Sequence, residues 1–253
     1  MLSPEASRVW EFLSRQPALA GFVLVGGTGL ALRLRHRRSD DFDLAFPAEQ
    51  LPRGRIEALV RIAPGQGIRL ALSQDEAAAS QFLEAGLELG DYQQNYLANG
   101  TVKVSFFSPE PPFRRILAGP AEDRVRIASL PELFKTKCLV SALRSKSRDW
   151  LDLYLLLRNH GFSIRDYHAA FAEAGVDAQW EIGMSRLCSG VRQADDEGYA
   201  HLLPRSPTLE EMRDFFVAQR NVLEISLARD RSRAGQESAP SCRGLGSWIT
   251  LTT

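Results

Sequence analysis

The sequence has few of the features that identify several large classes of protein. Its 253 residues include three cysteines, Cys138, Cys188 and Cys242, whose wide spacing argues against a disulfide framework or a zinc knuckle. Its four histidines show no HExxH or other metal-binding spacing. No apolar run approaches the roughly 18 residues of a membrane span, and the first residues lack the pattern of a secretory signal. We therefore expect a cytoplasmic protein with reduced thiols.

The chain also carries no excess charge of either sign. Its 31 Lys and Arg residues balance 31 Asp and Glu residues. This balance argues against a polycationic nucleic-acid coat or an acidic tail as the main function. Hydrophobic residues make up 44% of the chain, and a compact fold of this size buries roughly 70% of the surface of the extended chain. The composition therefore predicts a globular protein with a substantial core.

Hydrophobic patterning predicts alternating helices and strands in the first half of the chain. Strands are expected at 21–25, 42–46, 67–72, 91–98 and 101–107. Helices are expected at 4–15, 29–37 and 49–62. The last two strands flank Asn99-Gly100, a strong hairpin signal because both turn positions require positive φ. We predict that residues 1–112 form a mixed α/β (α+β) sheet flanked by helices.

The second half is predicted to be helical. Capping boxes at 129–132 and 208–211 mark two helix starts, because a Ser or Thr side chain and a Glu three residues later satisfy each other's backbone N–H groups. The expected helices are 129–144, 147–159, 163–174 and 208–227. We assign residues 113–228 to a helical domain. Residues 229–253 lack periodicity and are rich in Gly, Ser and Pro, so they are predicted to be disordered.

A glycine bend between a strand and a helix is the first sign of a functional site. The predicted strand at 21–25 leads into Gly26-Gly27-Thr28 and then into a helix. Backbone N–H groups and the positive end of the helix dipole meet at such a point, and together they form an anion site. Glycine lets a phosphate approach the backbone closely, and Thr28 adds a hydroxyl. The bend is therefore a candidate phosphate-binding site.

Two carboxylates follow the bend at a spacing that suits a metal ion. Asp41 and Asp43 lie two apart on a predicted strand, so both side chains emerge on one face with Cα atoms about 6.5 Å apart. The pair repels unless a cation lies between the two groups, and oxygen ligands suit Mg²⁺ or Mn²⁺. Asp40 is offset by one residue and is expected to face away. A phosphate site beside paired carboxylates is typical of phosphoryl or nucleotidyl transfer.

Other phosphate-binding motifs are missing from the sequence. Gly27-Thr28-Gly29 begins the G-x-G-x-x-G pattern, but Leu32 stands at the third glycine position. There is no GK[ST] sequence of a P-loop and no G-x-S-x-G elbow. Taken alone, two glycines indicate a tight turn and two aspartates a solvated strand face. Their combination favours a site.

These residues resemble the AbiEii/AbiGii toxin family of the DNA polymerase β-like nucleotidyltransferase superfamily. The resemblance rests on residues 26–28 with 36–44, and on a second stretch over residues 133–154, in the family's order and spacing. It covers about residues 20–160. It implies a polymerase β-like mixed sheet followed by a helical domain. It also implies a toxin of a toxin–antitoxin or abortive-infection system, with a cognate antitoxin protein as partner.

The resemblance also implies a role for each matching residue. Residues 26–28 would hold the phosphates of a nucleotide, and Asp41 and Asp43 would bind the metal ions. Lys137, preferred to Lys135 by the match, would reach a phosphate. Asp149, in an Arg-Asp-x-x-Asp stretch, would supply a further acidic group.

One position departs from the superfamily pattern. A third carboxylate is usual on a neighbouring strand, and the residue aligned there is Ser105, which is no base near neutral pH without strong help. We expect Asp149 to supply that function, and the alternative is a weak or silent enzyme. Asp152 lies four residues after Arg148, so an intrahelical ion pair is expected for it.

The sequence predicts a Mg²⁺-dependent (or Mn²⁺-dependent) enzyme that moves a nucleoside monophosphate from an NTP such as ATP to an acceptor hydroxyl. The acceptor is a tRNA 3′ end, a protein or a small molecule, and the sequence does not choose. The alternative is a silent relative that binds a nucleotide or a partner protein. A basic stretch is either an ordinary helix face or a patch for an RNA acceptor; it comprises Arg33, Arg35, Arg37 and Arg38. Four aromatic residues are expected in the core or in cross-strand pairs rather than as platforms for stacking bases: Tyr92, Tyr96, Phe106 and Phe107.

Overall fold

A six-stranded mixed sheet organises the fold. The computed structural model describes residues 2–120 and 122–237. Within them the strands follow the order β3-β4-β5-β2-β1-β6. Their bounds are β1 Val23–Val25, β2 Phe42–Ala45, β3 Leu70–Leu72, β4 Gln93–Ala98, β5 Val102–Phe107 and β6 Arg126–Ile127. The β2–β5 and β1–β6 pairs are parallel and the other pairs are antiparallel. The predicted mixed sheet is therefore confirmed.

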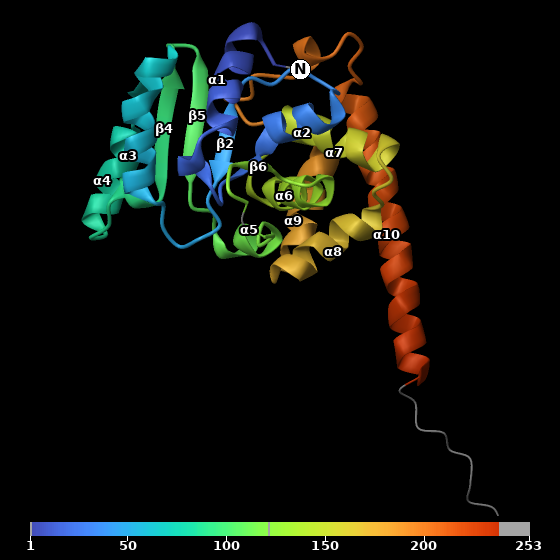
Figure 1. The fold of residues 1–253 in the computed structure, drawn as a ribbon. Helices are drawn as coiled ribbons and strands as arrows, with labels where there is room; N and C mark the ends of the chain where they lie inside the picture. Colours follow the sequence, from blue (N-terminus) through green and yellow to red (C-terminus); the bar gives the residue numbers. More distant parts are fainter. Residues whose placement is uncertain (1, 121, 238–253) are drawn as a thin grey trace, which may run out of the picture.

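Helices flank the sheet and then form a helical region (Figure 1). Those interleaved with the strands are α1 Pro4–Ser14, α2 Gly26–Leu34, α3 Arg53–Ile62, α4 Glu76–Glu84 and α5 Pro111–Ile116. Those of the helical region are α6 Leu130–Leu143, α7 Ser147–Asn159, α8 Ile164–Ala174, α9 Gln179–Ser189 and α10 Leu209–Glu237. None of the helices in 2–120 and 122–237 is both long and apolar enough to cross a membrane.

The two faces of the sheet support two separate cores. Leu24 of β1 packs with α1 and α3, whereas Val23 and Val25 pack with the helical region. The same alternation divides β2 and β5. Phe42 and Leu44 enter the first core, so Asp43 between them lies on the face toward the helical region. The sheet therefore places Asp43 where the two halves of the chain meet.

Local signals placed most helix and turn boundaries correctly. The Ser129 and Glu132 side chains form the capping box of α6, and Thr208 and Glu211 form the same pair at α10. The hairpin turn at Asn99 and Gly100 has φ values of 51° and 77°. These features depend on residues close in sequence, which is why sequence patterns find them.

Three features differ from the predictions. Helix α10 continues to Glu237, so the predicted disorder from residue 229 is wrong for 229–237; the rest of that segment lies outside the described residues. Helices α4, α5 and α9 and strand β6 were not expected. Strand β6 lies beyond the predicted domain boundary at residue 112, yet it pairs with β1. The sheet is thus completed by a strand from the second half of the chain.

Candidate active site

The glycine bend forms the first turn of a helix. Strand β1 ends at Val25 and helix α2 begins at Gly26, three residues earlier than the sequence pattern predicted. Gly26 has φ +69°, a left-handed conformation that side chains disfavour. The N–H groups of a first helical turn have no intrahelical partner. The bend therefore presents free donors and a positive helix end toward whatever lies in front of it.

The two glycines leave room for two charged side chains. A Cβ on Gly26 would lie 2.3 Å from Oδ2 of Asp43, and a Cβ on Gly27 would lie 2.4 Å from Nη2 of Arg37. Asp43 comes close because β1 and β2 pair Val25 with Asp43. The bend and Asp43 are therefore brought together, and only glycine fits at the point of contact. Asp41, the other predicted carboxylate, is exposed just before β2 and does not line the pocket that holds Asp43.

Asp43 is a carboxylate in an unfavourable setting. Burial raises its pKa, and the charge of Asp41 raises it further against the opposing pull of Lys137. Partial burial also raises the pKa of Asp41, against the charges of Lys103 and Arg148. Among the described residues, neither carboxylate forms a hydrogen bond or ion pair with another side chain. Two close carboxylates without a cation partner are a donor set that fits Mg²⁺ or Mn²⁺.

A pocket of about 490 Å³ opens beside this carboxylate. Its charged and polar lining contains predicted residues, namely Gly26, Gly27, Asp43, Ser105 and Lys137. It also contains two cations that the sequence reasoning missed, Lys103 and Arg144. Lys103 lies two residues before Ser105 on β5, so strand periodicity alone would have placed both on the pocket face.

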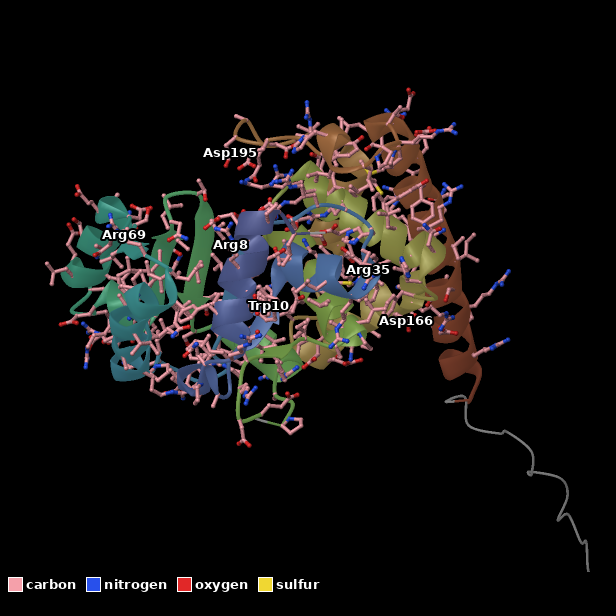
Figure 2. All side chains as sticks on the ribbon, turned by 45° about the horizontal axis from the view of Figure 1, so that its top comes forward. Arg8, Trp10, Arg35, Arg69, Asp166 and Asp195 are labelled. Atoms are coloured by element: carbon pink, nitrogen blue, oxygen red, sulfur yellow. The ribbon has the colours of Figure 1, made fainter. Side chains whose placement is uncertain are left out.

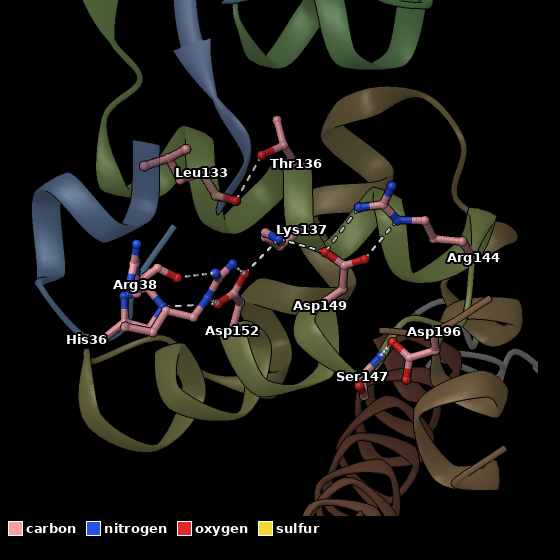
Figure 3. A network of polar contacts seen from close by, with 11 residues as sticks. His36, Arg38, Leu133, Thr136, Lys137, Arg144, Ser147, Asp149, Asp152 and Asp196 are labelled. Atoms are coloured by element: carbon pink, nitrogen blue, oxygen red, sulfur yellow. Dashed lines mark hydrogen bonds and ion pairs between the residues drawn. The ribbon is translucent and has the colours of Figure 1, made fainter. Parts of the chain in front are cut away.

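Lys137 enters the pocket from α6 in a fixed position. Its Nζ lies 2.6 Å from Oδ1 of Asp149 and 2.7 Å from Oδ2 of Asp152 (Figure 3). Burial alone would lower the pKa of Lys137, but the two carboxylates raise it above its ordinary value. The ammonium group is therefore held charged. Lys135 instead pairs with Glu173 at the surface, which agrees with the choice of Lys137.

Asp149 is bound by two cations in the folded chain. It does not line the pocket. Its carboxylate binds Lys137 and also accepts a 2.8 Å bond from Nε of Arg144. Burial tends to raise its pKa, but Lys137 and Arg144 hold it below the ordinary value. A carboxylate so engaged is a poor general base, and its contacts hold two pocket cations in place.

Asp152 is the buried centre of the same network. Oδ1 accepts a 2.7 Å bond from Nε of Arg37 and lies 3.0 Å from Nε2 of His36. Burial opposes its charge, yet Lys137 and Arg37 keep its pKa well below the usual range. The expected ion pair with Arg148 is wrong, because Arg148 binds Glu197 instead.

Thr28 and Asp40 are the two remaining predicted positions: the contacts of Thr28 were not predicted, whereas Asp40 lies as expected. Thr28 is fully buried, and its hydroxyl bonds the carbonyl oxygen of Asp41 and Oγ of Ser39. It therefore holds the backbone at Asp41, just before β2, and is not open to a phosphate. Asp40 binds the backbone N–H of Ser3 and faces away from the pocket as predicted.

Ser105 stands beside Asp43 as the sequence alignment indicated. The parallel β2–β5 pairing sets the two residues side by side, and Ser105 is buried. In the described part of the chain, no group of three or more His, Cys, Asp or Glu side chains could hold a metal ion. The carboxylates that line the pocket are those of Asp43 and Glu110, and Ser105 stands where the sequence analysis expected a third carboxylate of the metal site.

The arginines of the predicted basic stretch are dispersed, and the four aromatic residues lie partly in the core and partly in the pocket lining. The basic stretch forms no continuous patch: Arg33 bonds carbonyl oxygens of residues 127 and 128, and Arg38 pairs with Asp40. Arg35 is exposed at the end of α2 (Figure 2). Four aromatic residues were expected in the core or in cross-strand pairs. Tyr96 and Phe106 pack together in the core, whereas Tyr92 and Phe107 line the pocket.

Comparison with known proteins gives a family match over most of the chain. The family model described as "Nucleotidyl transferase AbiEii toxin, Type IV TA system" matches residues 8–230. An uncharacterised protein of Aquifex aeolicus (strain VF5) is 26% identical over 203 residues, which cover 77% of this chain and 84% of that protein.

Two solved structures are also similar. JHP933 from Helicobacter pylori is 16% identical, with a TM-score of 0.49 over 94% of this chain and 100% of that chain. The nucleotidyltransferase toxin MenT4 from Mycobacterium tuberculosis H37Rv is 12% identical, with a TM-score of 0.48 over 85% of this chain and 84% of that chain.

Proposed function

The chain belongs to the AbiEii nucleotidyl transferase toxin family, and on this premise we propose that it transfers a nucleoside monophosphate from an NTP to an acceptor hydroxyl. In this reaction the acceptor oxygen attacks the α-phosphorus, the bond from the α-phosphorus to the β-phosphate oxygen breaks, and pyrophosphate leaves. The observation that carries the proposal is the contact between Gly26 and Asp43 inside one cation-lined pocket. Positioning and charge neutralisation supply most of the catalysis in reactions of this class.

The pocket residues have complementary tasks toward a triphosphate. The N–H groups of Gly26 and Gly27 and the end of α2 receive phosphate oxygens. Lys103, Lys137 and Arg144 line the same pocket and offset the negative charge of the ligand. Lys137 and Arg144 are ordered before the ligand arrives, because Asp149 binds both. Such preorganisation reduces the rearrangement needed during the reaction.

Asp41 and Asp43 would hold Mg²⁺, which when bound neutralises charge on the phosphates. The carboxylates support this assignment through their raised pKa values and their lack of a cation partner among the described side chains. Neither Ser105 nor Asp149 is suited to accept the acceptor's proton, since the first is a hydroxyl and the second is bound by two cations.

The family also points to partners. A toxin of a type IV toxin–antitoxin system implies a cognate antitoxin. The acceptor of the nucleotide remains a tRNA 3′ end, a protein or a small hydroxyl compound, and the base of the NTP is equally open.

Label transfer tests the proposal. The chain is incubated with each α-³²P-NTP, Mg²⁺, total tRNA and whole-cell protein, and the labelled product is separated. Asp41→Asn and Asp43→Asn should each abolish transfer while keeping a folded protein, because both remove a charge that the metal needs. Asp40→Asn is the matched control, since Asp40 binds Ser3 and Arg38 away from the pocket. Equal transfer by Asp43→Asn and Asp40→Asn contradicts the proposal.

Binding without transfer is the second candidate function, and Ser105 favours it. The residue occupies the place of a third carboxylate directly beside Asp43, so the site lacks the usual group for activating an acceptor hydroxyl. Calorimetry with NTP and Mg²⁺ separates the two functions. Binding with no labelled product from any acceptor fraction supports the second candidate.

A further inference from the structure

The pocket is divided into a charged part and an aromatic part. Along β5, residues Lys103, Ser105 and Phe107 alternate with core residues and all line the pocket. Successive members of this row are about 7 Å apart. The row therefore runs from a cation, past the level of Asp43, to an aromatic ring. A ligand that follows it meets a polar environment first and an apolar one next.

Other elements enlarge the aromatic part. The pocket lining there includes Phe82 from α4, Phe113 from α5 and Tyr92, which follows a 3-10 turn at Leu89–Asp91 before β4. The Phe82 and Tyr92 rings lie 5.5 Å apart at 48°. Strand register places this pair beside Phe107, because Gln93, next to Tyr92, pairs with Phe107. These rings come from four separate segments and converge on one cavity.

Helix α4 has little structural reason to carry a phenylalanine at this point. None of its residues is buried, and it lies at the outer side of the sheet in Figure 1. Two adjacent residues of this helix differ in their surroundings. Leu83 is 73% exposed and borders a different surface depression. Phe82 is half-buried and lies against the Tyr92 ring. The helix thus presents one ring to the pocket.

We propose that Phe82 and Tyr92 form the subsite for the base of the nucleoside triphosphate. The inference rests on the proposed function, because it places the triphosphate at Gly26, Lys137 and Arg144. A planar heterocycle stacks on an aromatic ring whatever its hydrogen-bonding edge, so the rings supply affinity with weak discrimination between bases. Neither ring carries a positive charge that would attract a bare phosphate chain. The subsite therefore distinguishes a nucleotide from inorganic triphosphate.

Calorimetric titration of the full chain tests the subsite with two ligands. One ligand is the NTP that the wild-type chain binds most tightly in the presence of Mg²⁺, and the other is inorganic triphosphate with Mg²⁺. The variants are Phe82→Leu, which keeps apolar bulk but loses the ring, and Phe82→Trp, which keeps a stacking surface. Leu83→Ala is the matched control on the same helix. Thermal unfolding of each variant verifies that it is folded.

Phe82→Leu should weaken NTP binding by about tenfold, the size expected for one base–aromatic contact. Its affinity for inorganic triphosphate should be unchanged. Phe82→Trp should bind NTP within about twofold of wild type, and Leu83→Ala should leave both affinities unchanged. Tyr92→Leu should resemble Phe82→Leu, which supplies a second variant should the first fail to fold.

Two results overturn the inference. One is NTP binding by Phe82→Leu and Tyr92→Leu at wild-type affinity, which leaves the proposed function intact. The other is an equal loss of affinity for NTP and triphosphate, which assigns the rings a purely structural role. A wild-type chain that binds neither ligand contradicts the proposed function as well.

Discussion

Gly26 and Asp43 define the site at the scale of single residues. The carboxylate of Asp43 occupies the space where any side chain on residue 26 would begin, since Oδ2 lies 2.3 Å from the ideal Cβ position. The strand pairing of Val25 with Asp43 fixes the backbone of Asp43, so the carboxylate stays close to residue 26. A substitution at Gly26 therefore acts first on the position of a functional group and only second on stability.

The first prediction compares two glycines with the same backbone strain. Gly26→Ala and Gly67→Ala both place a Cβ on a residue with φ near +70°, but Gly67 has open space around it. Each should lose about 1 kcal/mol of unfolding free energy from the left-handed conformation. Gly26→Ala alone should lose about a hundredfold in label transfer, the size expected for a displaced catalytic group. Similar transfer rates for the two variants contradict the role of the Gly26–Asp43 contact.

Sequence motifs identified residues whose role follows from backbone position. Gly26, Gly27 and Asp43 were found because a strand–glycine–helix bend and a two-residue carboxylate spacing have a fixed geometry. The contacts of Thr28 and Asp149 were not predicted, because they depend on partners that only the folded chain supplies. The hydroxyl of Thr28 bonds the backbone of Asp41, and the partners of Asp149 lie on and just after α6.

At the scale of elements, Asp152 joins three helices. It lies on α7 and contacts Lys137 of α6 and Arg37, which follows α2. Its side chain is fully buried. The loss of its carboxylate therefore removes one ion-pair partner from each of two buried cations, Lys137 and Arg37.

The second prediction concerns the stability of this junction. Asp152→Ala should lower the unfolding free energy by about 3–5 kcal/mol, measured by urea denaturation, because a buried charge pair is broken from one side. Glu173→Gln is the control, since Glu173 pairs with Lys135 at the surface, and it should change stability by at most about 0.5 kcal/mol. A loss for Asp152→Ala as small as that of the control shows that the network does not hold the junction.

The third prediction concerns the pH dependence of the stability that Asp149 and Asp152 contribute. The pKa values of Asp149 and Asp152 are lowered on folding, so their stabilising contribution is complete above the unfolded carboxylate pKa of about 4. It is lost as the pH falls from there through the lower folded values. Wild-type stability should therefore fall steeply below pH 4, and Asp152→Asn should show a shallower fall. Parallel stability curves for the two proteins contradict the assigned shifts.

Elements with strong local signals were predictable and the others were not. Helix α6 has a capping box and eight buried residues. Helix α4 buries none, so its sequence carries no regular apolar face for a pattern to detect. Strand β6 has two residues, and its existence depends on pairing with β1 from far along the chain. Long-range pairing of this kind leaves little trace in local sequence.

At the scale of the whole molecule, the sheet joins the two predicted domains. Strand β1 contributes Leu24 to one core and Val23 and Val25 to the other. Strand β6, from beyond the predicted boundary at residue 112, adds to the same sheet. The pocket likewise takes Asp43 from the first half and Lys137 from the second. Separation of the halves would therefore remove the site.

The fourth prediction is that the two halves unfold together. Differential scanning calorimetry should give one transition, with equal calorimetric and van't Hoff enthalpies. Two resolved transitions, or a van't Hoff enthalpy well below the calorimetric one, indicate that the halves are independent. The predicted division at residue 112 would then describe two autonomous domains.

Under the proposed function, the fold disfavours the charge of Asp43, and the carboxylate is kept because it would hold Mg²⁺. Burial and the charge of Asp41 raise its pKa, so ionisation of this carboxylate lowers the stability of the folded chain. The most direct test measures melting temperature without divalent ions and label transfer with Mg²⁺ on one variant, Asp43→Asn. We expect this variant to have a higher melting temperature than wild type and to show no transfer. A lower melting temperature with transfer retained contradicts this expectation.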